Sequence, residues 1–347
     1  MTNEQIDLRS DTITRPVPEM RQVMANAEVG DDVFGDDPTI TKLEAATAEI
    51  LGKEAAVYVP SGTMANQLAV RCHTQPGDEI LLDANAHIIW YEAGAPAALS
   101  GASCRVIQGT RGIFTVDQFL EALRPANIHM ASTRLVALEN THNRGGGSVW
   151  PLDQLTDVCL AAREKNIVSH LDGARLWNAS IATGIPESDY AKHADSVSVC
   201  FSKGLGAPVG SVLAGSSIFI DRARHFRKQF GGGMRQAGII AAGALYALRH
   251  HRDRLKEDHD NARKLGLSLA EVPGINIDSD SVVTNLVYFD VEHMTATEMV
   301  LKLAQSGVLV IATGPSTIRA VTSLEVDSKD IDKVISKIGK IASEMNE

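Results

Sequence analysis

A carboxylate and a lysine stand at equivalent places in two successive segments of this chain. Asp172 closes the apolar run 166–172, and Lys203 closes the run 196–203; a glycine follows each of them. Both runs have the composition of buried strands, and ligands of open α/β sheets bind outside the carboxyl ends of the strands. Pyridoxal phosphate (PLP) needs a lysine that forms a Schiff base and a carboxylate that keeps the pyridine nitrogen protonated. The pair therefore predicts a PLP site.

A glycine-containing junction supplies a place for a phosphate. The segment Pro-Ser-Gly-Thr-Met-Ala-Asn (60–66) joins a predicted strand to a predicted helix. Gly62 allows close approach of the backbone, and the first amides of the helix, with the hydroxyl of Thr63, suit an anion. The junction is therefore a candidate phosphate loop.

Two further side chains complete the constellation. His87 follows the predicted strand 78–83 and offers a ring that stacks on a cofactor. Arg319 lies in the predicted strand 317–323 near the end of the chain, and its guanidinium suits bidentate binding of an amino-acid carboxylate. Each residue alone has an ordinary explanation as a turn, a helix start or a surface charge. The order of all five along one chain favours a site.

Alternating strand and helix patterns must position these groups. Predicted strands alternate with helices in a way that indicates a mostly parallel sheet with helices on both faces. The predicted strands are 55–60, 78–83, 134–140, 166–172, 196–202 and 210–215, and the predicted helices are 63–72 and 152–165. A charged helix at 249–266 and a shorter strand and helix pattern follow, with strands at 285–291, 308–313 and 317–323. We expect an α/β fold with a large domain at 1–250 and a small α+β domain at 251–347.

Composition excludes several classes of protein. The 347 residues are 44% hydrophobic and 22% charged, which is typical of a globular protein. No run of 18 apolar residues predicts a membrane span, and the polar N-terminus predicts no signal peptide. The net charge of −10 disfavours a nucleic-acid partner. Four cysteines without a CxxC pair favour a reducing, cytoplasmic setting.

Other ligand motifs are missing or incomplete. The chain has no Walker A and no HExxH pattern, and the glycines at 204–210 do not fit the dinucleotide fingerprint. The acidic segment 31–37 lacks the spacing of an EF-hand loop, so we interpret it as a turn before a helix.

Long motifs resemble those of the low-specificity L-threonine aldolases, which are PLP enzymes of the aspartate-aminotransferase fold (type I) within the β-eliminating lyase superfamily. The resemblance covers nearly the whole chain. It is carried by the segments 6–16, 29–39, 60–69, 87–94, 128–143, 171–179, 202–211, 231–239 and 318–326. It implies a large domain with a mostly parallel seven-stranded sheet and a small C-terminal domain.

The resemblance also implies roles for individual residues. Lys203 would be the Schiff-base lysine and Asp172 the pyridinium partner. Gly62 and Thr63 would hold the phosphate, and His87 would stack on the ring. The substrate carboxylate would be bound by Arg175, Arg319 and Ser10, and His129 would approach the substrate hydroxyl. Lys228 and Arg235 would reach the cofactor of a neighbouring subunit, in a homodimer or a homotetramer built from such dimers.

The implied reaction is reversible cleavage of L-threonine, L-allo-threonine and related β-hydroxy-α-amino acids to glycine and an aldehyde. The general base is His87, His129 or a water, and the sequence does not choose among them. Alternatives are β-elimination or racemisation on the same scaffold, or a protein of this fold without catalysis. Two residues depart from the family pattern: Phe34 stands where many relatives have tyrosine, and Trp150 follows a glycine-rich stretch.

Overall fold

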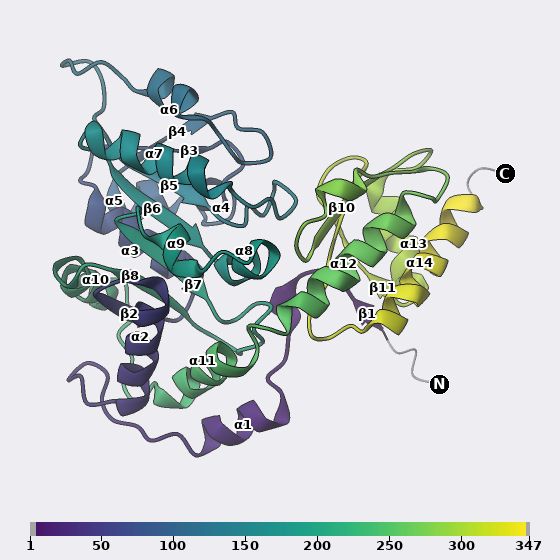
Figure 1. Cartoon of the computed structure of the whole chain (residues 1–347), viewed down its shortest axis with the longest axis horizontal. Coiled ribbons are helices and arrows are strands. Elements are labelled where there is room, and N and C mark those ends of the chain that lie inside the picture. Colours follow the sequence, from purple (N-terminus) through teal and green to yellow (C-terminus); the bar gives the residue numbers. More distant parts are fainter. Residues whose placement is uncertain (1–4, 345–347) are drawn as a thin grey trace.

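The computed structural model describes residues 5–344 and centres on a seven-stranded sheet (Figure 1). Along the sheet the strands are β2 (Ala55–Val59), β8 (Ser211–Gly215), β7 (Ser196–Cys200), β6 (Val168–Gly173), β5 (Thr133–Glu139), β3 (Glu79–Asp83) and β4 (Ser103–Ile107). Only β8 runs antiparallel to its neighbours. The central strands are almost wholly buried, as expected of a sheet covered on both faces. The predicted seven-stranded, mostly parallel sheet is confirmed.

Helices cover both faces of this sheet. They are α1 (Pro18–Ala25), α2 (Pro38–Leu51), α3 (Gly62–His73), α4 (His87–Trp90), α5 (Ala95–Ser100), α6 (Val116–Ala122), α7 (Leu152–Glu164), α8 (Leu176–Thr183), α9 (Glu187–Ala191), α10 (Ser217–Gln229) and α11 (Gly238–His250). The start of α2 explains the acidic segment before it. The carboxylate of Asp37 accepts hydrogen bonds from the N–H groups of Thr39 and Ile40, so it caps the helix. The predicted turn before a helix is confirmed.

A second hydrophobic core lies in the C-terminal part of the chain. Its elements are α12 (Leu255–Leu269), β9 (Ile275–Asn276), β10 (Leu286–Val291), α13 (Ala296–Gln305), β11 (Val308–Leu309), β12 (Ile311–Ala312), β13 (Thr317–Val321) and α14 (Ser328–Ser343). The sheet order is β12-β13-β10-β9, and all pairs are antiparallel. Helix α14 buries Ile331, Val334 and Ile338 against this core and is capped by Asp327.

The N-terminal arm belongs to both parts of the molecule. Strand β1 (Ile6–Asp7) pairs in parallel with β11, and the side chains of Ile6 and Leu8 lie in the C-terminal core. From there the chain passes to α1, which packs against α11 beneath the large sheet (Figure 1). The arm therefore carries residues 9–14 along the boundary between the two parts. A domain boundary near residue 250 stays a proposal.

Two predicted elements are wrong in detail. The charged segment 249–266 is not one helix, because α11 ends at His250 and α12 begins at Leu255. The intervening His251 is buried, with its Nδ1 2.7 Å from the carbonyl oxygen of Leu205, so this turn packs behind the Lys203 loop. The predicted strand 308–313 is divided as well: β11 pairs with the arm and β12 with β13.

Among the helices of residues 5–344, none combines the length and the apolar character that a membrane span requires.

Candidate active site

One edge of the large sheet collects most of the predicted site residues. Asp172 and Glu139 are paired neighbours at the carboxyl ends of β6 and β5. Lys203 lies in the loop after β7, His87 begins α4 after β3, and Gly62 begins α3 after β2. The carboxyl ends of parallel strands meet at a single edge, which is where α/β sheets bind ligands.

The carboxylate of Asp172 is buried and hydrogen-bonded. Its Oδ2 accepts a 2.7 Å hydrogen bond from Nδ2 of Asn66, and its Oδ1 accepts one from the N–H of Ala174. Burial alone would raise the pKa of Asp172, but the charges of His87 and Lys203 outweigh it and hold that pKa below its ordinary value. Asp172 is therefore an anion in a dry site, as a partner for a protonated ring nitrogen must be.

Lys203 is held against Cys200, the last residue of β7. Its Nζ donates to Sγ of Cys200 at 3.2 Å, and its carbonyl oxygen accepts a hydrogen bond from the hydroxyl of Thr14. Sγ also accepts a hydrogen bond from the hydroxyl of Ser211. A Cβ added to Gly62 would lie 2.8 Å from the same sulfur. The lysine and the start of α3 therefore pack around one atom.

These residues fit PLP. The hydroxyl of Ser61 accepts a hydrogen bond from the N–H of Met64, which leaves the first amides of α3, at Gly62 and Thr63, for an anion. Gly62 stands where any side chain would fill the space beside Cys200. With Lys203 and Asp172, the donor set matches the phosphate, the aldehyde and the ring nitrogen of the cofactor.

His87 is fixed by two glutamates. Its backbone N–H donates to Oε2 of Glu139 at 2.7 Å, and its Nδ1 lies 2.9 Å from Oε1 of Glu92. Burial would lower the pKa of His87, but the hydrogen bond with Glu92 and the charges of Asp172 and Glu139 raise it above its ordinary value. The ring therefore has a fixed position beside Asp172 and an increased affinity for a proton.

Arg319 reaches the site edge from the C-terminal sheet. Its Nη1 donates to Oδ1 of Asn143 at 3.2 Å, and its Nη2 donates to the carbonyl oxygen of Arg9 at 3.0 Å. Its Nε is buried and has no hydrogen-bond partner among residues 5–344. Ser10, next to Arg9, caps the short 3-10 turn Asp11–Ile13. The hydrogen bond to Arg9 ties Arg319 to the arm segment that contains Ser10, and their shared role stays a prediction.

Arg175 has a partner that sequence reasoning missed. Its Nε and Nη2 donate to the two carboxylate oxygens of Asp11, each at 2.8 Å, and both residues are buried. Burial would lower the pKa of Arg175, but Asp11 raises it, so the guanidinium stays charged. No partner of Nη1 is found among residues 5–344, and this nitrogen is the one available for a carboxylate.

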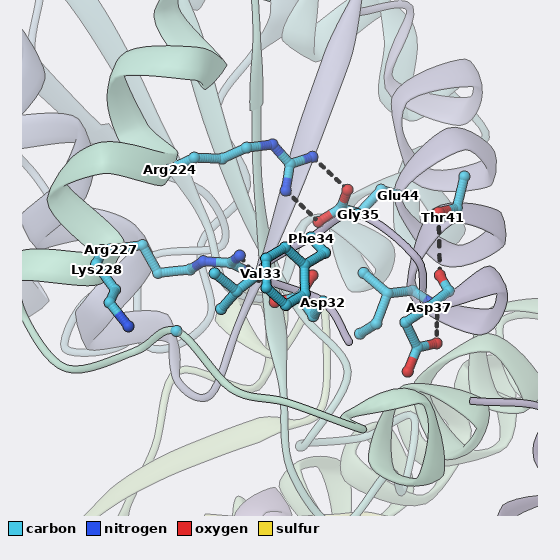
Figure 2. A pocket seen from close by; sticks show the side chains of 12 residues that line it. Asp32, Val33, Phe34, Gly35, Asp37, Thr41, Glu44, Arg224, Arg227 and Lys228 are labelled. Atoms are coloured by element: carbon cyan, nitrogen blue, oxygen red, sulfur yellow. Dashed lines mark hydrogen bonds and ion pairs between the residues drawn. The ribbon is translucent and has the colours of Figure 1, made fainter. Parts of the chain in front are cut away.

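Within residues 5–344, neither Lys228 nor Arg235 forms a hydrogen bond or ion pair with Asp172, Lys203 or His87. Lys228 is exposed and lines a pocket of about 550 Å³ between α10 and the loop 32–35. Figure 2 shows Arg224 and Arg227 extending from α10 toward Glu44 and that loop. Phe34 also lines the pocket and is 76% exposed. Arg235 forms an exposed ion pair with Asp31.

His129 is not brought to the site within one chain. It lies on an exposed loop that leads into β5, whereas Glu139 and Asp172 lie at the other end of β5 and β6. Six residues of strand span about 20 Å. A role for His129 at this edge therefore requires a second copy of the chain.

Trp150 lies beneath the site. Its side chain is fully buried and packs edge-on against Phe114, and its Nε1 donates to the carbonyl oxygen of Glu139. It therefore supports the end of β5 and does not face a substrate.

The polar residues that sequence reasoning missed are Asn66, Glu92, Glu139, Asn143 and Asp11. Each is buried and stands within a motif that the sequence analysis quoted. A polar or charged residue inside an otherwise apolar segment was the available signal, since such groups are buried only with partners.

The fold and this arrangement define a PLP fold type I protein. Its structure resembles Leishmania major threonine aldolase (TM-score 0.84, 21% identity, covering 97% of this chain and 99% of that one). It also resembles serine palmitoyltransferase of Sphingomonas wittichii (TM-score 0.77, 17% identity, covering 99% and 88%).

Sequence comparison identifies the family more closely. The Beta-eliminating lyase family model matches residues 7–292. Low-specificity L-threonine aldolase 1 of Arabidopsis thaliana is 41% identical, over 97% of this chain and 96% of its own. The low specificity L-threonine aldolase of Escherichia coli (strain K12) is also 41% identical, over 95% and 97%. The chain belongs to the beta-eliminating lyase family and, within it, to the low-specificity L-threonine aldolases.

Proposed function

We propose that this protein is a PLP-dependent lyase that cleaves L-threonine, L-allo-threonine and related β-hydroxy-α-amino acids to glycine and an aldehyde. The observation that carries the proposal is the buried, ionised Asp172 beside Lys203 and His87 at the carboxyl edge of the sheet. Relatives 41% identical over nearly the full length carry the name of this activity. When the Cα–Cβ bond breaks, Cβ leaves as the aldehyde carbon, and Cα takes up a proton in its place to give glycine.

The cofactor would be held by four groups of this chain. Lys203 would bind it covalently, Asp172 would keep a proton at the ring nitrogen, and the amides of Gly62 and Thr63 would bind its phosphate. When bound, PLP supplies an electron-withdrawing ring that accepts the electrons of the Cα–Cβ bond. The ionised state of Asp172, held by its charged neighbours, stabilises the ring proton that this withdrawal needs.

Three side chains would orient the substrate. The free Nε of Arg319 and the hydroxyl of Ser10 lie where the arm meets the C-terminal sheet, and they would bind the carboxylate. Arg175 would contribute its Nη1 while Asp11 holds its other two nitrogens. Fixing the carboxylate fixes which bond of Cα stands perpendicular to the ring.

A base must take the proton of the β-hydroxyl as the aldehyde C=O forms. His87 lies at the edge with its Nε2 free, His129 would have to come from a second copy, and a bound water is the third option. We propose His87 as the residue that receives the proton, directly or through such a water, because its ring is already oriented by Glu92.

We also propose that the protein works as a homo-oligomer, a dimer or a tetramer of such dimers, with sites at subunit boundaries. The exposed Lys228, Arg235 and Phe34 would face a second copy, with Lys228 and Arg235 reaching its cofactor. A cytoplasmic location suits the four cysteines, all of which are free, and the acidic charge suits neither a nucleic acid nor a membrane surface.

The test is a spectrum and an assay on the purified protein. Addition of PLP should produce the visible absorbance of a lysine Schiff base, and L-threonine or L-allo-threonine should then yield acetaldehyde and glycine in equal amounts. Lys203→Ala should lose both signals. Ammonia and a keto acid in place of glycine would identify β-elimination, and exchange of configuration without aldehyde would identify racemisation. Either result would overturn the proposed reaction while keeping the fold.

A further inference from the structure

Glu92 is a fully buried carboxylate whose only part in the proposed steps is to orient the ring of His87. Its Oε1 faces Nδ1 of His87 at 2.9 Å and accepts a 2.8 Å hydrogen bond from Nδ2 of Asn66. Its Oε2 accepts a 2.6 Å hydrogen bond from Nε2 of Gln67. An ionised carboxylate only accepts hydrogen bonds. Its neighbours here are two amide donors and a ring nitrogen, so this side chain is built to be charged.

This arrangement determines which nitrogen of His87 carries the proton. Oε1 of Glu92 is an acceptor, so the ring donates from Nδ1, and the neutral ring then has its lone pair on Nε2. Nε2 has no hydrogen-bond partner among residues 5–344, and the His87 side chain is 30% exposed. The free nitrogen is thus the one left for a substrate or a water.

The same amide group joins this pair to Asp172. Nδ2 of Asn66 donates to Oε1 of Glu92 and to Oδ2 of Asp172, and Oδ1 of Asn66 accepts a hydrogen bond from Ser198. Ligand atoms of His87, Glu92 and Asp172 lie within 4.8 Å of one another. The two amide hydrogens between the carboxylates account for that approach. A continuous hydrogen-bonded chain therefore runs from the ring of His87 to Asp172.

We propose that Glu92 is a positioning residue that holds the Nδ1 proton of His87, so that Nε2 accepts the proton of the substrate hydroxyl. The inference rests on the proposed aldolase function. A carboxylate behind an imidazole fixes its tautomer and stabilises the imidazolium that forms, as in catalytic triads. Burial strengthens the effect, because a charge in a dry site is poorly screened.

Other charged groups also face His87, and the test must separate Glu92 from them. Glu139 comes from β5, Asp172 from β6 with Lys203 and His170 beyond it, and the ring of Tyr91 lies 5.4 Å away. Each remains in place when only the charge of Glu92 is removed. Glu92→Gln does this with little change of shape. The buried Oε1 of Gln67, which has no partner, can turn to accept from the new amide.

The direct measurement is the titration of His87 in the holoenzyme and in the cofactor-free protein by NMR of histidine labelled at Cε1. The peak is assigned with His87→Asn. We expect the wild-type midpoint above about 6.5 and a fall of roughly one unit or more in Glu92→Gln. Glu79→Gln is the matched control. It removes an equally buried carboxylate, held by Arg124 and Thr133 at the other end of β3 from His87, and should leave the midpoint unchanged.

Kinetics supply the second readout. In Glu92→Gln the rise of kcat/KM with pH should move to lower pH by the same interval as the His87 midpoint, with the plateau of kcat at least tenfold lower and KM little changed. Glu92→Asp keeps the negative charge, but its shorter side chain places the carboxylate farther from His87. Compared with Glu92→Gln, it should therefore recover most of the His87 midpoint and part of kcat.

An unchanged His87 midpoint in Glu92→Gln, or a wild-type midpoint at or below the ordinary value, would overturn the proposal. The midpoint of the wild-type protein is measured without Glu92→Gln, so this outcome can be tested even if that variant fails to fold. A wild-type protein that releases no aldehyde would overturn the proposed function instead, and the titration would still decide the role of Glu92.

Discussion

Oδ1 of Asn143 accepts a 3.2 Å hydrogen bond from Nη1 of Arg319, and this bond joins the loop after β5 to strand β13. The carbonyl oxygen of Asn143 also accepts a hydrogen bond from the hydroxyl of Tyr288, and its N–H donates to Glu139. A residue of the loop after a large-sheet strand therefore sets the direction of a guanidinium that belongs to the C-terminal sheet. The proposed binding of the substrate carboxylate by Arg319 would therefore depend on this contact between the two parts.

Asn143→Ala should weaken substrate binding more than it slows turnover. The loss of one hydrogen bond to a charged group costs about 1.5–3 kcal/mol, so KM for L-threonine should rise by roughly tenfold or more, with a smaller change in kcat. Steady-state kinetics measure both. Asn276→Ala, at an exposed position of β9, is the matched control and should behave as wild type. A lower kcat at unchanged KM would contradict this role.

Gly62→Ala should weaken cofactor binding. The new methyl group would stand 2.8 Å from Sγ of Cys200, closer than carbon and sulfur approach, so the start of α3 or the lysine contact must shift. We expect at least a tenfold rise in the dissociation constant of PLP, measured by titrating the visible absorbance. Cys200→Ala creates room for the methyl group, so the double variant should bind PLP more tightly than Gly62→Ala alone. Additive losses in the double-variant cycle would show that the sulfur is not the obstacle.

The sheet and the main site residues were predictable because their signals are local. Apolar runs ending in Asp172 and Lys203 give both the strands and the edge at which their side chains meet. Asp37 and Asp327 are ordinary capping residues just before helices, and both cap. Such features depend on a few neighbouring residues, which is what a sequence pattern records.

The partners of these residues were not predictable, because each is fixed by contacts across the fold. Asp11 meets Arg175 across 164 positions, and Asn66 meets Asp172 across 106. The break between α11 and α12 has the same origin, since the packing of His251 against Leu205 ends a segment whose own composition favours a helix. Long-range pairing of this kind leaves no periodic trace.

His170 makes the stability of the fold depend on pH. It is buried on β6 between Ser196 and Asn66, and burial lowers its pKa to about 4. The unfolded chain binds the proton at about 6.5, so the stabilisation is fully present above that pH and is lost as the pH falls toward 4. The loss is on the order of 2–3 kcal/mol.

Urea unfolding between pH 7 and 4 measures this dependence. Because glutamine does not titrate, His170→Gln should flatten the part of the slope that lies between pH 6.5 and 4. His293→Gln, which replaces an exposed histidine, should leave the slope as in wild type. An identical slope in wild type and His170→Gln would exclude His170 as the cause.

Subunit complementation tests whether Lys228 acts on another copy's site. Lys228 lies on α10 and lines the pocket of Figure 2, and Lys203 is not among the residues of that lining, so we propose that Lys228 acts on the site of a partner. Lys228→Ala and Lys203→Ala should each lose most activity alone. In a mixed dimer both lesions fall on one site and the other site is intact, because a two-fold interface exchanges the same residues in both directions. Refolding the two variants together should therefore restore about a quarter of wild-type activity, since half of the dimers are mixed and each has one intact site.

Arg263→Ala, an exposed change on α12, is the control. Mixed with Lys203→Ala, it should give only the activity of the undamaged sites that the Arg263→Ala chains already supply, with no gain on mixing. Absence of any gain on mixing the two inactive variants would mean that Lys228 serves its own chain.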